Sequence, residues 1–157
     1  MRRRMPAEAV RRSALLPRSG GVVAALVAAT LAAPCGAATV QITVSGVSPN
    51  GGSVLTSLCQ GGLDRAACAR GQNQPADGSV LTFLFPDIEP GRYAALAFQD
   101  LEGDGVLQRS RMGRPLEPYG ISNGAGRLRR PTFEQAAVSV GPGGARIAIR
   151  LVRSGSP

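Results

Sequence analysis

Acidic residues alternate along one segment of the chain, and this spacing is typical of cation binding. Asp100, Glu102 and Asp104 occupy every second position, and Gly105 follows directly. Oxygen ligands at alternate positions, followed by a glycine that permits a sharp turn and then by a hydrophobic residue such as Leu107, form the first half of a calcium loop. The three acids are therefore the candidate metal ligands, and calcium is the candidate cofactor.

The second half of this segment departs from the calcium pattern. Position nine is Gln108 rather than an acid, and position twelve is Arg111, whose guanidinium would repel a divalent cation. Glu117 could supply a carboxylate from the next turn. An acidic β-turn, in which Asp and Gly serve turn geometry alone, explains the same residues, and both interpretations stay open.

The catalytic patterns in the sequence lack the partners that they need. Residues 120–124 (GISNG) match the G-x-S-x-G pattern of a hydrolase nucleophile, but the chain has no histidine to act as its base. Without lysine, a Walker-type phosphate loop and Schiff-base chemistry are also excluded. We therefore expect no enzymatic activity. A hydrolase that uses the carboxylates near Asp100 and Glu117 is the weaker alternative.

The N-terminal segment has the composition of a secretory signal peptide. Six arginines within the first 18 residues precede an uncharged run, residues 21–33, which is too short for a stable membrane-spanning helix. Small residues around Ala37 and Ala38 predict cleavage just after one of them. We therefore expect residues 1–37 to be a signal peptide and the processed chain, without a membrane span, to be periplasmic or extracellular.

Removing this signal peptide changes the charge and the cysteine count. The full chain has 18 Arg, no Lys and 10 acids, for a net charge of +8; six Arg and Glu8 lie in the signal, so 12 Arg and 9 acids remain, for +3. This charge does not support nucleic-acid binding. Cys35 is also lost, which leaves Cys59 and Cys68 as a pair for a structural disulfide in an oxidising compartment. Their spacing does not match the two-residue separation of redox or metal motifs.

The apolar residues of the processed chain alternate as in β-strands. Six short runs with a period of two are separated by Gly, Pro and Asn turns, at residues 40–44, 54–58, 80–85, 93–98, 136–140 and 147–151. They predict one all-β domain over residues 38–152, an antiparallel sandwich of about seven strands, followed by a short tail at residues 153–157. The core candidates are Phe83, Phe85, Tyr93, Leu96 and Ile149. Residues 98–132 contain no credible strand, so we expect one long ordered loop.

Three segments carry a resemblance to a known family: PGRYAALAFQDLEGDGVLQ, GRPLEPYGISN and RRPTFEQAAVSV. Over residues 40–152 they resemble the bacterial secreted proteins of domain-of-unknown-function family 2141. The resemblance implies a small exported sandwich, immunoglobulin-like or prealbumin-like, in which a Pro-Gly turn delivers Tyr93 into the core. It implies no biochemical activity.

These observations together predict an exported, non-enzymatic binding or accessory module of the cell envelope. Its partner would be an envelope protein or a glycan, recognised through Arg109, Arg111, Arg114, Glu117 and Tyr119 of the long loop. A calcium-stabilised structural domain is the alternative. A loop that merely covers an open sheet edge explains the same segment and also stays open.

Overall fold

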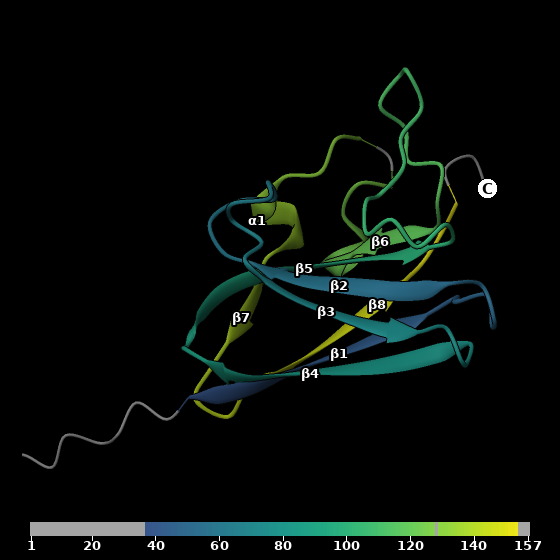
Figure 1. The fold of residues 1–157 in the computed structure, drawn as a ribbon. Coiled ribbons are helices and arrows are strands. Elements are labelled where there is room, and N and C mark those ends of the chain that lie inside the picture. Colours follow the sequence, from purple (N-terminus) through teal and green to yellow (C-terminus); the bar gives the residue numbers. More distant parts are fainter. Residues whose placement is uncertain (1–36, 128, 154–157) are drawn as a thin grey trace, which may run out of the picture. The chain divides into compact units, whose positions relative to one another are not determined.

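Two β-sheets pack face to face in the computed structural model, which describes residues 37–127 and 129–153 (Figure 1). The three-stranded sheet has the order β4–β1–β8, with bounds Val80–Ile88, Ala38–Ser45 and Ala145–Arg150. The five-stranded sheet has the order β3–β2–β5–β6, with bounds Arg70–Pro75, Ser53–Cys59, Gly91–Asp100 and Tyr119–Ile121, and β7 (Val138–Val140) also pairs with β5. The all-β sandwich is thus confirmed, with eight strands among the described residues. One pairing is not antiparallel, because β1 and β8 run parallel.

The core lies between the sheets because the apolar residues of each strand alternate with polar ones. Val40, Ile42 and Val44 on β1 are fully buried, and the core candidates Phe83, Phe85, Tyr93 and Ile149 are buried in the same cluster. Burying a side chain of this size contributes roughly 1.5–3 kcal/mol relative to leaving it exposed. Leu96 differs from the other candidates, because it lies on the opposite face of β5 and is only partly buried, in a second, smaller cluster.

Strand β3 has no apolar residue except Pro75, yet it closes one side of the sandwich. Its Gln72 and Gln74 side chains donate hydrogen bonds to the carbonyls of Leu84 and Thr82 on β4, and Arg70 donates to Pro86 O at 2.9 Å. These bonds join the edges of the two sheets and occupy carbonyls that would otherwise be free to pair with another strand.

Two local expectations from the sequence are wrong. Ala136 does not belong to a strand; it ends the short helix α1 (Phe133–Ala136), which begins with a capping box between Thr132 and Gln135. Residues 98–132 are not free of strands either, because β6 (Tyr119–Ile121) lies within this range and pairs with β5.

The described residues contain no helix long and apolar enough to cross a membrane. Residues 1–36 of the expected signal peptide and residues 154–157 of the expected tail lie outside the part of the chain that the structure describes.

Candidate recognition site

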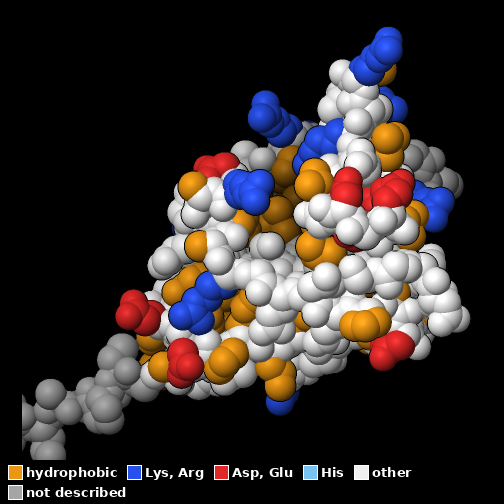
Figure 2. All heavy atoms as spheres, viewed as in Figure 1, with side chains coloured by type: hydrophobic (Ala, Val, Ile, Leu, Met, Phe, Trp, Pro, Cys, Tyr) orange, Lys and Arg blue, Asp and Glu red, His pale blue; other side chains and the backbone are white. Residues whose placement is uncertain are grey.

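Two connections rise from the outer face of the five-stranded sheet. The disulfide loop, residues 59–68, leads from β2 towards β3, and the projecting connection, residues 101–118, joins β5 to β6 and extends well beyond the sheet (Figure 1). On the face between them lie Leu96 and Phe98, since Ala95 and Ala97 face the core. Figure 2 shows a hollow with hydrophobic side chains in it between the projecting connection and the region of α1.

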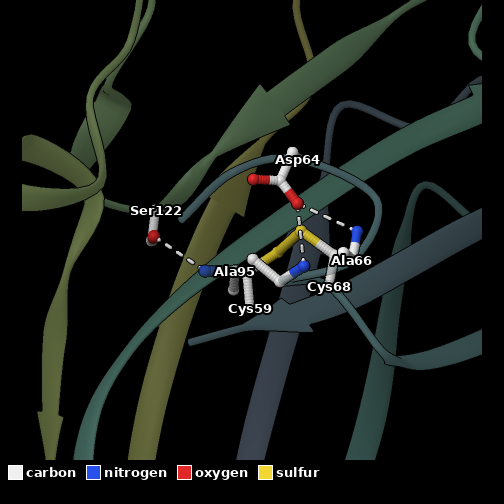
Figure 3. The surroundings of a disulfide bond; sticks show 7 residues. Cys59, Asp64, Ala66, Cys68, Ala95 and Ser122 are labelled. Carbon is white, nitrogen blue, oxygen red and sulfur yellow. Dashed lines mark hydrogen bonds between the residues drawn. A yellow bond between two sulfur atoms is a disulfide. The ribbon is translucent and has the colours of Figure 1, made fainter. Parts of the chain in front are cut away.

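The disulfide loop is closed by the predicted bond between Cys59 and Cys68, which is formed (Figure 3). Inside the loop, the carboxylate of Asp64 accepts hydrogen bonds from the backbone N–H groups of Ala66 and Ala67, both at 2.9 Å. The Cys59 side chain lies in the small cluster on the outer face of the sheet. Covalent closure and local hydrogen bonds thus fix the conformation of this loop, and Cys59, which pairs with Ala94, joins it to β5.

The projecting connection begins at Asp100, the last residue of β5, whose carboxylate is buried. Oδ1 and Oδ2 each accept a hydrogen bond at 2.7 Å, from the N–H groups of Gly103 and Gly105, and Oδ1 also accepts one from Asp104 at 3.3 Å. Both glycines have positive φ angles, 81° and 72°, which turn the chain around the carboxylate. Burial alone would raise the pKa of Asp100, but these N–H donors outweigh it and hold the pKa below its ordinary value.

Glu117 closes the other end of the same connection. Its side chain is buried, and its two carboxylate oxygens accept hydrogen bonds from the N–H groups of Leu101 at 2.9 Å and Gln108 at 3.0 Å. The carboxylate therefore joins the start, the middle and the end of the connection. The sequence placed Glu117 among the recognition residues, whereas its contacts give it an anchoring position.

Asp100, Glu102 and Glu117 form the acidic group of the site, with a carboxylate oxygen of each within 4.8 Å of the others. Asp104, the third predicted metal ligand, points elsewhere: its oxygens accept from Val106 N–H at 2.8 Å and from the Gln108 amide at 2.7 Å. Local desolvation and the negative charge of Glu117 raise the pKa of Glu102. Of the three carboxylates, Glu102 is therefore the one whose negative charge is least favoured when no cation lies nearby.

The far end of the projecting connection is a tight turn. Gly113 N–H donates to Ser110 O at 2.8 Å, and Arg114 N–H donates to the Ser110 hydroxyl at 3.2 Å. Arg109 donates through Nη1 to Gly113 O at 3.1 Å, which fixes one guanidinium along the turn. The predicted recognition residues Arg109, Arg111 and Arg114 are all exposed here, together with Met112, which is 86 % exposed.

Tyr119, the last predicted recognition residue, lies apart from this turn. It opens β6, pairs with Phe98 on β5, and its hydroxyl donates to Gly126 O at 3.2 Å. The structure therefore brings together the three arginines of the turn and separates them from the acidic group and from Tyr119.

Ser122, which gave the match to a hydrolase pattern, has a structural position. Its side chain is fully buried and accepts from Ala95 N–H at 3.0 Å (Figure 3). It also donates to Ala136 O at 2.6 Å, which connects β5 to α1. Sequence reasoning also missed Gln99, a fully buried amide that bonds to Ser48 and Gly51 and fixes the crossing between the sheets. A Gln within an otherwise apolar strand was the only signal for it.

Over the residues that the structure describes, the fold and the site define a small β-sandwich with the Cys59–Cys68 disulfide and a connection anchored by buried carboxylates. The chain belongs to a family of uncharacterized proteins conserved in bacteria, domain of unknown function 2141, whose model matches residues 42–148. This range includes both connections. No curated protein and no solved structure matches the chain.

Proposed function

We propose that the chain is an exported, non-enzymatic binding module of the cell envelope and that the projecting connection is its recognition element. The observation that carries this proposal is the position of the exposed apolar side chains. Six large hydrophobic residues are exposed among the described residues, and four of them lie in this connection: Leu101, Val106, Met112 and Leu116. Several exposed apolar side chains in one connection that also carries arginines are typical of interaction sites.

The anchoring of the connection supports the same role. A recognition element binds more tightly when its conformation is set before binding, because less conformational entropy is then lost. Asp100 and Glu117 provide this order through five hydrogen bonds from backbone N–H groups. The absence of His and Lys from the sequence, together with the two hydrogen bonds of the Ser122 hydroxyl, favours binding over catalysis.

Export is supported by the disulfide, and the first residues of β1 favour one of the two predicted cleavage positions. Disulfides persist in oxidising compartments outside the cytosol. Ala38 is the first residue of β1 and is buried in the core, whereas Ala37 is exposed. Cleavage after Ala37 preserves the whole strand, and cleavage after Ala38 would remove a core residue. Sequencing the N-terminus of the exported protein should therefore find Ala38; a chain that starts at Thr39, or one that keeps the Arg-rich head, would contradict this.

Site-specific crosslinking tests the recognition element. A photoreactive residue is placed at Met112, and a control is placed at Val80, which is 55 % exposed on β4 in the other sheet. In intact cells, we expect the probe at position 112 to capture an envelope component and the probe at position 80 to capture none. Equal capture by both probes, or capture at position 80 alone, would remove the projecting connection from the proposed function.

A calcium-stabilised structural domain is the second candidate, because the acidic group of Asp100, Glu102 and Glu117 favours it. Calcium binds six to eight oxygens, so backbone carbonyls or water would have to complete these three carboxylates. A bound cation would also offset the desolvation and the repulsion by Glu117 that raise the pKa of Glu102. We expect calcium to raise the melting temperature relative to EDTA and Glu102→Gln to abolish this shift, while Glu89→Gln, a change at an exposed acid elsewhere, leaves it intact. A melting temperature that calcium does not change would exclude this candidate.

A further inference from the structure

We propose that the tip of the projecting connection, residues 109–114, docks on an anionic phospholipid surface. This inference rests on the recognition role proposed above and names its partner. The tip contains three exposed arginines and Met112, whose side chain is the most exposed among the large hydrophobic residues described. A cationic turn with an apolar side chain at its end has the two properties that a negatively charged membrane interface accepts together.

Charge is separated along the projecting connection. Residues 109–114 carry three arginines and no acid, while Asp100, Glu102 and Asp104 lie at the base, next to the sheet. Figure 2 shows the same separation on the visible face, with Lys or Arg side chains at the far end of the projection and Asp or Glu side chains nearer the sheets. The base would be repelled by anionic lipid, so approach with the tip first is the orientation that the charges favour.

The hydrogen bonds within the tip leave the side chains of Arg111 and Met112 exposed for contact with a partner. Ser110 accepts from Gly113 and Arg114, which closes the turn from within, and Arg111 and Met112 occupy the exposed positions between them. Because the turn is already formed, docking requires little further ordering of the backbone. The guanidinium groups can bond to lipid phosphates in the bidentate manner that suits arginine.

A fluid lipid surface suits these side chains better than an acidic protein surface does. An acidic protein would satisfy the three arginines but would need a pocket shaped for Met112. A bilayer interface accepts a single long apolar side chain without a preformed pocket, while the arginine stems lie along its apolar boundary. With only one apolar residue at the tip, association should be weak, reversible and reduced by salt.

Co-sedimentation with lipid vesicles tests the proposal on the exported chain, which has no Trp to report binding by fluorescence. Vesicles of phosphatidylcholine mixed with phosphatidylglycerol are compared with vesicles of phosphatidylcholine alone. We expect binding to the anionic vesicles only, roughly 25-fold weaker after the combined change Arg111→Gln and Arg114→Gln, since each basic residue near an anionic surface accounts for about fivefold. At high salt the charges are screened, and Met112→Gln should then reduce the vesicle binding that remains in the parent chain.

Two control variants and a comparison with the crosslinking result decide whether the lipid inference holds. Arg146→Gln and Val80→Gln change exposed residues of the three-stranded sheet and should leave vesicle binding unchanged. Equal binding to both kinds of vesicle, or unchanged binding by the double arginine variant, would overturn the lipid inference. If vesicles fail to bind while the Met112 probe still captures an envelope protein, the inference fails and the proposed function stands. If the chain neither binds vesicles nor captures an envelope component through the Met112 probe, the lipid inference and the proposed function both fail.

Discussion

The two connections on the outer face of the five-stranded sheet are held in place by different chemistry. A covalent bond between Cys59 and Cys68 closes the disulfide loop, whereas the buried carboxylates of Asp100 and Glu117 hold the projecting connection through backbone N–H donors. A disulfide responds to reductant and not to mild acid. The Asp100 carboxylate, whose pKa is lowered by its backbone N–H donors, responds to protonation and not to reductant. The two connections should therefore fail under different conditions, although they rise from the same sheet.

Truncation of Glu117 should give the largest effect. Glu117→Ala removes the acceptor of two backbone N–H groups, Leu101 and Gln108, and hydrogen bonds to a charged group contribute about 1.5–3 kcal/mol each. We expect the free energy of unfolding, measured with urea, to fall by about 3–6 kcal/mol. Glu89→Gln, at an exposed acid, serves as the control. A Glu117→Ala chain within about 0.5 kcal/mol of the parent would show that this carboxylate anchors nothing.

Removal of the disulfide should have the next largest effect. A ring of this size limits the entropy of the unfolded chain by roughly 2–3 kcal/mol in the loop-closure model. We expect the paired change Cys59→Ser and Cys68→Ser to lower the free energy of unfolding by that amount and to make it insensitive to reductant. The projecting connection should keep its response to acid in this variant. If acid sensitivity were lost as well, the two connections would not be independent.

The pH dependence of stability should distinguish Asp100 from Glu102, because their pKa values are shifted in opposite directions. Since the folded-state pKa of Asp100 lies below its ordinary value of 3.8, its contribution to stability is present above that pH and is lost as the pH falls through the folded pKa. Glu102 has the opposite sign: its pKa lies above 4.5, so its ionisation disfavours the fold as the pH rises through that raised value. Unfolding free energies measured across this range should show a weaker acid dependence in Asp100→Asn. In EDTA, Glu102→Gln should be slightly more stable than the parent near neutral pH.

A change in the core between the two sheets should have a small effect in the stabilising direction. Thr56 on β2 is buried, and its hydroxyl has no hydrogen-bond partner among the described residues. Thr56→Val replaces that hydroxyl with a methyl group of similar size, so we expect the melting temperature to rise, with a gain in stability of about 1 kcal/mol. A fall in melting temperature would mean that the hydroxyl is satisfied in solution.

The sequence predicts the strands that carry alternating apolar residues and misses those that do not. Strands β1, β4, β5 and β8 follow from this alternation, and the disulfide follows from the cysteine count. Strand β3 could not be predicted in this way, because Gln72 and Gln74 face β4 with amides that bond to its carbonyls. The role of Glu117 was also hidden, since it meets Leu101 only after the chain has folded back over 16 residues. The alternating acids predict an acidic segment here, but they do not show which carboxylate oxygens accept hydrogen bonds from the backbone.

Hydrogen exchange at individual amides is the most direct test of whether the buried carboxylates hold the projecting connection in one conformation. The N–H groups of Leu101, Gly103, Gly105 and Gln108 donate to buried carboxylates, while Arg111 and Met112 lie in the exposed turn. We predict strong protection of the first four amides at neutral pH, rapid exchange at the two turn residues, and loss of protection at Leu101 and Gln108 in Glu117→Ala. Exchange of all these amides at the rate of an unstructured chain would contradict the account.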